Sequence, residues 1–208
     1  MSLEIKKRII TSFFLLILLF LMFYYSFVLI ISLIIISVIA WFEFFVIISK
    51  IFKKNILKDK IYRFFGKSIS LAYLFIILYL IIINLDLKNY IFYIFLISIF
   101  SDIGGLVIGR SFKGKKLTKI SPNKTRSGSI GSFIFSLLLI PFFYSDLSIF
   151  NIYSLIIFTI LVSMISQLGD LFISFLKRKA KVKNTSDLLP GHGGVLDRID
   201  GIVFAVPM

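Results

Sequence analysis

Three aspartates in the last forty residues are of a type and spacing that could do chemistry. Asp170 ends an apolar stretch, and Asp197 and Asp200 are three residues apart, a spacing that puts both on one face of a helix. Gly193 and Gly194 come directly before this pair and would allow a tight entry into that helix. Because the chain has no cysteine and one histidine, such a site would be rich in oxygen and suited to Mg²⁺. The pattern predicts a cation site that acts on phosphates.

The same region also supplies groups that bind phosphate. The start of a helix at Asp197 would present unpaired backbone N–H groups, and the guanidinium of Arg198 adds a fork of donors. A carboxylate such as Asp170 costs about 2.5 to 3.5 kcal/mol at the centre of a membrane helix, so it requires a partner or a water-filled cavity. A simpler alternative stays open, in which Asp197 and Asp200 cap a helix and pair with Arg198, and His192 is an ordinary loop histidine.

The elements that must position these residues are membrane helices. Of the 208 residues, 59% are hydrophobic, and several apolar runs exceed the roughly 18 residues that a spanning helix needs. Helices satisfy the backbone in lipid, and the alternating pattern of barrel strands is missing. We therefore predict an all-α, polytopic membrane bundle of about six full spans plus a short C-terminal helix. The first apolar run lacks a small-residue cleavage site and is expected to remain as an anchor.

The expected helices follow the apolar runs. Residues 9–48 are long enough for two helices, with a turn at residues 24–26, and four further spans are expected at residues 68–85, 90–108, 128–144 and 147–167. The last segment, residues 195–208, would reach only about 21 Å as a helix and is expected to span partially or to pack beneath the others.

Charge predicts the orientation of the bundle. Of the 24 basic residues, all but Lys88 fall in four segments, residues 6–8, 50–67, 110–126 and 177–198, and consecutive segments are separated by two spans. All four can therefore face the cytoplasm, together with the N-terminus and the active-site loops. The net charge of +14 is explained by this topology and by attraction to anionic lipids. Nucleic acid is not an expected partner, because the basic residues flank membrane helices and no stacking platform accompanies them.

Two polar segments carry the residues that resemble a known family. The chain is similar to the phosphatidate cytidylyltransferases (CDP-diacylglycerol synthases) over residues 101–208, and most specifically over residues 169–200. The N-terminal half resembles the family only in its hydrophobic spans and in a loosely placed Glu43. The positions that match the C-terminal signature of this family are Ser174, Lys177, Arg178, Lys183, Ser186, Leu189, Pro190, His192, Gly193, Gly194, Val195, Asp197, Arg198, Ile199 and Asp200.

The chain departs from the pattern of the family at three places. Asn184 stands where the signature usually has aspartate, so a carboxylate role there is either dispensable or taken by nearby Asp187. Upstream, residues 121–128 resemble an S-P-x-K-T-x-E-G segment with Ser127 in place of the glutamate, and Gly105-Leu106 replaces a small-aromatic pair. The glycines at 104, 105 and 109 could equally serve close helix packing.

The resemblance implies a Mg²⁺-dependent transferase of phospholipid biosynthesis that uses CTP and phosphatidic acid. It also implies a catalytic membrane region over residues 101–208, preceded by membrane helices over residues 1–100, in the cell inner (plasma) membrane. The oligomeric state is left open, with a homodimer as one option, and a second cation beside the Mg²⁺ is an open alternative.

The resemblance also assigns roles to residues. It implies Asp170 and Asp197 as metal ligands and Asp200 as a further ligand or a support for them. Expected catalytic residues are Asp170, Asp197, Asp200, Arg198 and His192, with His192 orienting the loop or a phosphate. Expected substrate-binding residues are Ser121, Lys124, Thr125, Arg126, Lys177, Arg178, Gly193 and Gly194.

Three other functions share some of these sequence features. A cation transporter would use Asp102, Asp170 and Glu43 as pathway carboxylates, but it would want them near the bilayer midplane. A CDP-alcohol phosphatidyltransferase needs D-G-x-x-A-R, whereas Asp200-Gly201 is followed by Ile202, Val203 and Phe204. A CTP-dependent lipid kinase of related fold would be distinguished by whether CMP enters the product lipid.

Overall fold

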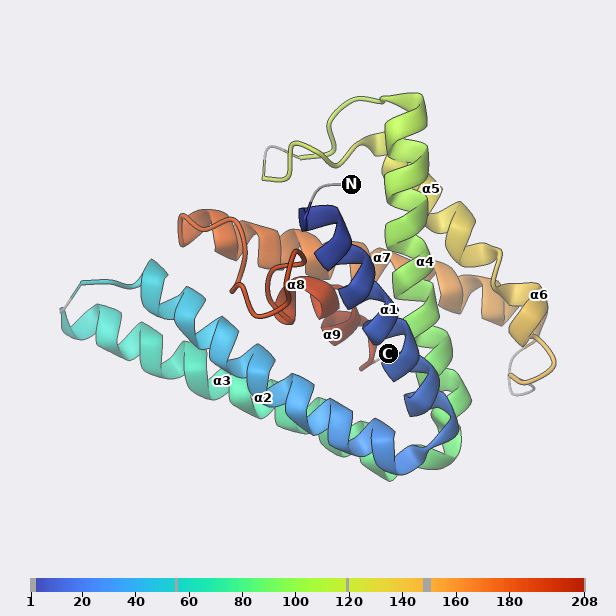
Figure 1. Ribbon diagram of the computed structural model, residues 1–208, viewed down its shortest axis with the longest axis horizontal. Helices are drawn as coiled ribbons and strands as arrows, with labels where there is room; N and C mark the ends of the chain where they lie inside the picture. Colours follow the sequence, from blue (N-terminus) through green and yellow to red (C-terminus); the bar gives the residue numbers. More distant parts are fainter. Residues whose placement is uncertain (1–2, 55, 119, 148–150, 208) are drawn as a thin grey trace. The chain divides into compact units, whose positions relative to one another are not determined.

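Helices dominate the computed structural model of the protein (Figure 1). The structure describes residues 3–54, 56–118, 120–147 and 151–207, except for the side chains of residues 3–5, 7 and 8. Within these residues the regular structure is helical apart from two isolated β-bridges, which confirms the predicted all-α class. The chain forms two compact units. The first comprises Met1–Leu85 and Leu176–Ile199, and the second comprises Asp86–Phe175 and Asp200–Met208.

The first unit contains three long helices: α1 (Leu3–Tyr24), α2 (Ser26–Ile51) and α3 (Leu57–Ile83). The predicted turn between the first two is confirmed, since Tyr25 is extended (φ −114°, ψ 107°) and separates α1 from α2. Figure 1 shows α2 and α3 side by side, and α3 begins well before the predicted residue 68. The C-terminal residues of α7 and the short helix α8 (Leu196–Ile199) complete this unit.

The second unit contains α4 (Lys88–Phe112), α5 (Arg126–Leu137), α6 (Ile140–Phe143), the larger part of α7 (Ile152–Lys179) and α9 (Ile202–Ala205). The short helix η1 (Leu85–Leu87) directly precedes α4. Its hydrophobic core contains Tyr93, Ile97, Leu155, Val162 and Ala205, all fully buried. Polar side chains between the helices are paired, with the Tyr93 hydroxyl 2.6 Å from Oγ1 of Thr159. Pairing of this kind removes the cost of burying polar groups in an apolar bundle.

Close packing of α4 on α5 explains the glycines at the end of α4. A Cβ added to Gly104 would lie 2.4 Å from the carbonyl oxygen of Gly131, and one added to Gly131 would lie 2.6 Å from the carbonyl oxygen of Gly104. Gly105 approaches the hydroxyl of Ser132, and Gly109 approaches that of Thr125. The packing role that stayed open for these three α4 glycines is therefore supported by their surroundings.

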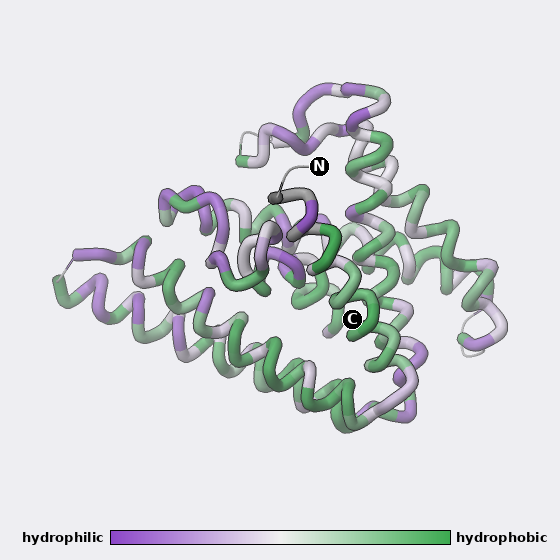
Figure 2. The backbone as a smooth tube through the Cα atoms, viewed as in Figure 1, coloured by the Kyte–Doolittle hydropathy of each residue, from purple (hydrophilic) through white to green (hydrophobic). Residues whose placement is uncertain are grey.

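In the part of the chain that the structure describes, five helical segments are long and apolar enough to cross a membrane by length and composition: Ser26–Ile51, Leu57–Ile83, Leu85–Phe112, Arg126–Phe143 and Ile152–Lys179. A sixth apolar stretch, Ile9–Tyr24, is shorter. Figure 2 shows that hydrophilic residues of α2 and α3 gather at the end where the two helices are joined, while the rest of the pair is apolar. The protein is therefore a multi-pass membrane protein.

The C-terminal segment differs from its predicted form. Instead of one partial span over residues 195–208, the described residues form two single turns, α8 and α9, separated at Asp200 and Gly201. Because α8 ends at Ile199, the expectation that Asp197 and Asp200 share one helical face is wrong. Residues 148–150 and 208, which belong to two of the predicted segments, lie outside the described residues.

Candidate active site

The first acidic residue of the candidate site, Asp170, lies on α7 in the second unit. Its Oδ2 forms an ion pair with the ammonium of Lys124, and its Oδ1 accepts a hydrogen bond of 3.2 Å from the hydroxyl of Ser174 one turn later. The side chains of Lys124 and Asp170 remain 29% and 22% exposed, respectively. The partner that a carboxylate requires in an apolar helix is thus a lysine from another segment, and the pair is open to water.

A loop between α4 and α5 carries Lys124. An isolated antiparallel bridge joins Lys116 to Thr125, and the amide of Leu117 donates to the carbonyl oxygen of Lys124 at 2.8 Å. The amide of Lys124 in turn donates to the carbonyl oxygen of Ser121 at 3.0 Å, so the S-P-N-K segment closes as a turn. This backbone pairing fixes the position from which Lys124 reaches Asp170.

Thr125 caps α5 at the end of this loop. Its Oγ1 accepts a hydrogen bond of 3.0 Å from the amide of Gly128, which satisfies one of the unpaired donors at the helix start. The same oxygen lies 3.0 Å from the hydroxyl of Ser127, the residue that stands where the family has glutamate. Arg126, the first residue of α5, is exposed, and Ser121 is half-buried.

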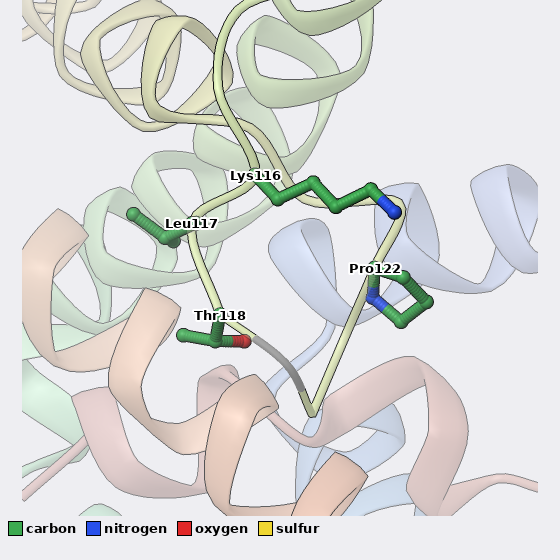
Figure 3. A pocket seen from close by; sticks show the side chains of 4 residues that line it. All are labelled: Lys116, Leu117, Thr118 and Pro122. Atoms are coloured by element: carbon green, nitrogen blue, oxygen red, sulfur yellow. The ribbon is translucent and has the colours of Figure 1, made fainter.

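A pocket of about 360 Å³ lies beside the same loop and is lined by Lys116, Leu117, Thr118 and Pro122. Figure 3 shows Lys116 extending toward the arm of the loop that carries Pro122. None of the four lining residues is a predicted site residue, although Pro122 follows Ser121 directly. The predicted phosphate-binding residues of this segment therefore lie next to the pocket in sequence but do not line it.

The second unit also holds Asp200, at the junction between α8 and α9. Asp200 is 7% exposed, and its Oδ1 accepts a hydrogen bond of 3.0 Å from the amide of Gly201. A Cβ on Gly169 would lie 2.8 Å from the carbonyl oxygen of Asp200, and a Cβ on Gly201 would lie 2.3 Å from Oγ of Ser166. The absence of a side chain at these glycines lets the C-terminal segment lie directly on α7. Gly169 directly precedes Asp170, so one of these contacts lies beside the candidate metal ligand.

The first unit holds Asp197, whose carboxylate is fully engaged. Its Oδ1 accepts a hydrogen bond of 2.6 Å from the ammonium of Lys177, while its Oδ2 accepts from the amides of Thr185 at 2.9 Å and Gly194 at 3.0 Å. The Thr185 hydroxyl lies 3.0 Å from the same Oδ2. The side chain of Asp197 is only 7% exposed. Asp197 is therefore neutralised by Lys177, as Asp170 is by Lys124.

These contacts decide the acidity of Asp197. Burial by itself would raise the pKa of this carboxyl group, but the hydrogen bonds from Lys177, Thr185 and Gly194, together with the charge of Lys177, outweigh burial and lower the pKa below its ordinary value of 3.8. Because the folded-state pKa is lowered, Asp197 contributes stability that is present above pH 3.8 and is lost as the pH falls through the folded-state value.

This linkage gives a prediction for acid unfolding. Asp197→Asn should be less stable than the wild type at pH 7, and the difference should shrink progressively below about pH 4. The check is detergent-solubilised unfolding of both proteins at pH 7, 5 and 3, with the exposed Asp187→Asn variant as the reference for general acid effects. A difference that is unchanged from pH 7 to pH 3 would contradict the assigned role of the carboxylate.

The glycine-rich loop before Asp197 is a tight turn. Gly191 and Gly193 have φ values of +77° and +84°, a left-handed conformation that side chains rarely adopt, and the amide of Leu189 donates to the carbonyl oxygen of Gly193 at 2.8 Å. The guanidinium of Arg198 donates to the carbonyl oxygen of His192 at 2.8 Å and 3.2 Å, and Nε2 of His192 lies 3.3 Å from the hydroxyl of Ser12. Arg198 therefore supports the loop in this state, and its guanidinium remains exposed.

One acidic residue at this loop was not assigned to the site from sequence. Glu43 of α2 is buried, and its carboxylate accepts hydrogen bonds from the amides of Val195 and Leu196 at 3.0 and 2.8 Å. It also accepts from the hydroxyls of Thr185 and Ser186. The signal that could have found it is the presence of a lone carboxylate in an otherwise apolar span.

The candidate residues differ in how they could hold a metal ion. Asp170 offers a half-buried carboxylate whose main partner is Lys124, a half-buried lysine that a cation could replace. Asp197 offers only Oδ1, after release of Lys177, because three donors occupy Oδ2. Among the described residues no three acidic or histidine side chains gather at one point suited to a metal. Both carboxylates have the oxygen atoms that a hard cation prefers as ligands. In the structure, the ammonium group of a lysine contacts each of them where a cation would bind.

Comparison with known proteins identifies the family of the chain. Residues 45–208 match the sequence profile of the Cytidylyltransferase family. Proteins named phosphatidate cytidylyltransferase are similar to the chain. The one from Staphylococcus haemolyticus (strain JCSC1435) is 43% identical over 126 residues, which are 59% of this chain and 48% of that protein. The one from Bacillus subtilis (strain 168) is 43% identical over 129 residues, 60% and 48% of the two chains. The chain thus spans about half the length of the curated relatives it matches.

Proposed function

Because the chain belongs to the cytidylyltransferase family, we propose that it is a phosphatidate cytidylyltransferase, which converts CTP and phosphatidic acid to CDP-diacylglycerol and pyrophosphate. In this reaction a phosphate oxygen of phosphatidic acid attacks the α-phosphorus of CTP. The bond from the α-phosphorus to the bridging oxygen of the β-phosphate breaks, and pyrophosphate leaves. The phosphate monoester is already ionised near neutral pH, so no side chain has to remove a proton from it.

The observation that carries the proposal is the pairing of the two expected metal ligands, Asp170 and Asp197, with a lysine each. Asp170 is paired with Lys124, and Asp197 with Lys177, all four being residues of the matched segments. Both substrates are anionic, so the main task of the protein is to supply positive charge around them. A lysine that exchanges its carboxylate for a substrate phosphate supplies that charge, while the freed carboxylate becomes available to a cation.

Magnesium is the cation that suits these carboxylates. Asp170 and Asp197 would hold it, and Asp200 would support the arrangement from its buried position. One ion, or two, would neutralise the charge of the triphosphate and of the leaving pyrophosphate. The proposal includes no further cofactor.

The remaining candidates would bind the phosphates. The exposed guanidinium group of Arg126 can turn toward a polyanion, and those of Arg178 and Arg198 can do so by leaving the carbonyl oxygens of Val182 and His192. Ser121 and Thr125 would donate hydrogen bonds from their hydroxyls. Gly193 and Gly194 would allow phosphate to approach the loop backbone, with His192 orienting that loop.

The setting of the reaction follows from topology and charge. We propose that the N-terminus and the basic loops face the cytoplasm at the inner (plasma) membrane, where CTP and the lipid phosphate meet. Residues 101–208 would form the catalytic region, and residues 1–100 the preceding membrane helices. The bilayer is the expected partner, nucleic acid is not, and the oligomeric state stays open, with a homodimer as one option.

The function is tested directly by following the nucleotide. Purified protein in detergent is incubated with α-labelled CTP, phosphatidic acid and Mg²⁺, and the lipid phase is examined for label. Label in the lipid phase, with release of pyrophosphate, is the expected result. Label that remains wholly aqueous with folded protein would remove the transferase, and a phosphorylated lipid without CMP would indicate a lipid kinase instead.

A further inference from the structure

Glu43 is a buried carboxylate to which the proposed reaction gives no task. It lies in α2, within the span Ser26–Ile51, and is 5% exposed. It also lies outside residues 45–208, the part of the chain that matches the family. A carboxylate is costly in a membrane-spanning segment and is expected to have a specific task there.

The partners of Glu43 show what that task is. Its Oε1 accepts hydrogen bonds from the hydroxyl of Ser186 at 2.6 Å and the amide of Val195 at 3.0 Å. Its Oε2 accepts from the hydroxyl of Thr185 at 2.8 Å and the amide of Leu196 at 2.8 Å. All four donors are neutral, and they come from both ends of the segment 185–196. One side chain of α2 therefore fixes both ends of the glycine-rich loop.

The contact continues from Glu43 to Asp197. The Thr185 hydroxyl lies 2.8 Å from Glu43 Oε2 and 3.0 Å from Asp197 Oδ2, so its single hydrogen serves both carboxylates. The amide of Thr185 donates to Asp197 as well, at 2.9 Å. Any shift of Thr185 therefore moves two of the groups that hold Asp197.

We propose that Glu43 is a positioning residue, which holds the segment 185–196 in place and through Thr185 orients the carboxylate of Asp197. It acts through these residues and does not touch the substrates. The role of Asp197 in transfer rests on the proposed function, whereas the anchoring of the loop by Glu43 does not.

The geometry requires a carboxylate at this position. Each oxygen of Glu43 receives one hydroxyl and one backbone amide. A hydroxyl can rotate and accept instead, but a backbone N–H can only donate. In Glu43→Gln the new NH₂ group would face the amide of Val195 or Leu196 whichever way the side chain turns. The substitution keeps the size of the side chain and still breaks the arrangement.

Loop order can be measured separately from activity because the chain has no cysteine. A spin label on Leu188→Cys reports on the loop, and one on Tyr153→Cys reports on a distant exposed position; the two side chains are 54% and 76% exposed. Glu43→Gln and Thr185→Val should each mobilise the label at residue 188 and leave that at residue 153 unchanged. Thr185→Ser, which keeps the hydroxyl, is the matched control and should leave both labels unchanged.

The kinetic readout uses the same variants without labels. Glu43→Gln and Thr185→Val should lower kcat at least tenfold and raise the Mg²⁺ concentration needed for half-maximal activity several-fold, with KM for phosphatidic acid changed less than threefold. Thr185→Ser should retain wild-type values. General loss of structure would instead lower the active fraction without moving the Mg²⁺ dependence.

The outcomes separate this inference from the proposed function. If the wild type transfers no CMP but Glu43→Gln mobilises residue 188, the transferase assignment fails and the anchoring stands. A label at residue 188 that stays restrained in both Glu43→Gln and Thr185→Val overturns the inference. Equal mobilisation of residues 188 and 153 also overturns it, because Glu43 would then support the whole fold and not this loop.

Discussion

Replacing Asp170 with asparagine is expected to abolish nucleotidyl transfer while the helices remain folded. Asparagine has nearly the same shape but no charge, so it neither pairs with Lys124 nor holds a cation. Loss of a group that stabilises developing charge costs about a thousandfold in rate or more, equivalent to roughly 4 kcal/mol. The measurement is transfer of label from α-labelled CTP to lipid at saturating Mg²⁺.

Two comparisons give this result its meaning. Asp197→Asn should be as severe as Asp170→Asn if both carboxylates hold the cation. Asp187→Asn should have a much smaller effect, because the Asp187 side chain is exposed and belongs to neither lysine pair. Equal activity in all three variants would show that the metal ligands have been assigned wrongly.

Replacing Gly194 with alanine is expected to be the most damaging single-methyl change in the first unit. The added Cβ would lie 1.9 Å from Oγ1 of Thr185, and 2.5 and 2.7 Å from the two carboxylate oxygens of Glu43. None of these atoms can retreat without giving up a hydrogen bond to the loop. We expect a loss of about 2 to 4 kcal/mol in the free energy of unfolding and a severe loss of activity.

Gly66→Ala is the matched control in the same unit. Gly66 lies inside α3, and the nearest atoms to its added Cβ would be carbons of the Ile48 side chain, at 3.3 and 3.7 Å. Alanine is favoured over glycine in a helix by about 0.5 to 1 kcal/mol, so this change should be nearly neutral. Thermal unfolding of both variants in one detergent checks the pair. If Gly194→Ala is as stable as Gly66→Ala, the inference that Thr185 and Glu43 leave no room for a side chain at residue 194 is wrong.

Much of this protein could be predicted without coordinates because a bilayer imposes simple rules. Apolar runs of sufficient length must become helices, since lipid offers no partner for an open backbone, and this alone predicted the all-α class and the break near Tyr25. The expectation of a tight turn at the signature glycines holds for Gly193, which has positive φ, as does Gly191 beside the signature positions. The turn could be predicted from the glycines because the backbone conformation of a turn depends mainly on its own residues.

The helical relation between Asp197 and Asp200 could not be predicted by spacing. Residues three apart share a face only if the helix continues through both, and α8 ends at Ile199. Gly201 approaches Ser166 so closely that a Cβ would lie 2.3 Å from its hydroxyl oxygen, which indicates that packing on α7 decides where this short helix stops. Tertiary contacts overrode a pattern that was sound for an isolated helix.

By itself the sequence determined that this is a helical membrane protein, which segments are apolar, and which charged residues gather in the two polar segments. Only the tertiary structure decided the partner of each charge: Lys124 for Asp170, Lys177 for Asp197, and the loop amides for Glu43. The physical reason is that burial in an apolar surrounding makes every charge require a partner, while the choice of partner depends on which segments pack together. Glu43 meets Thr185 across 142 residues of chain, a separation at which no sequence spacing carries information.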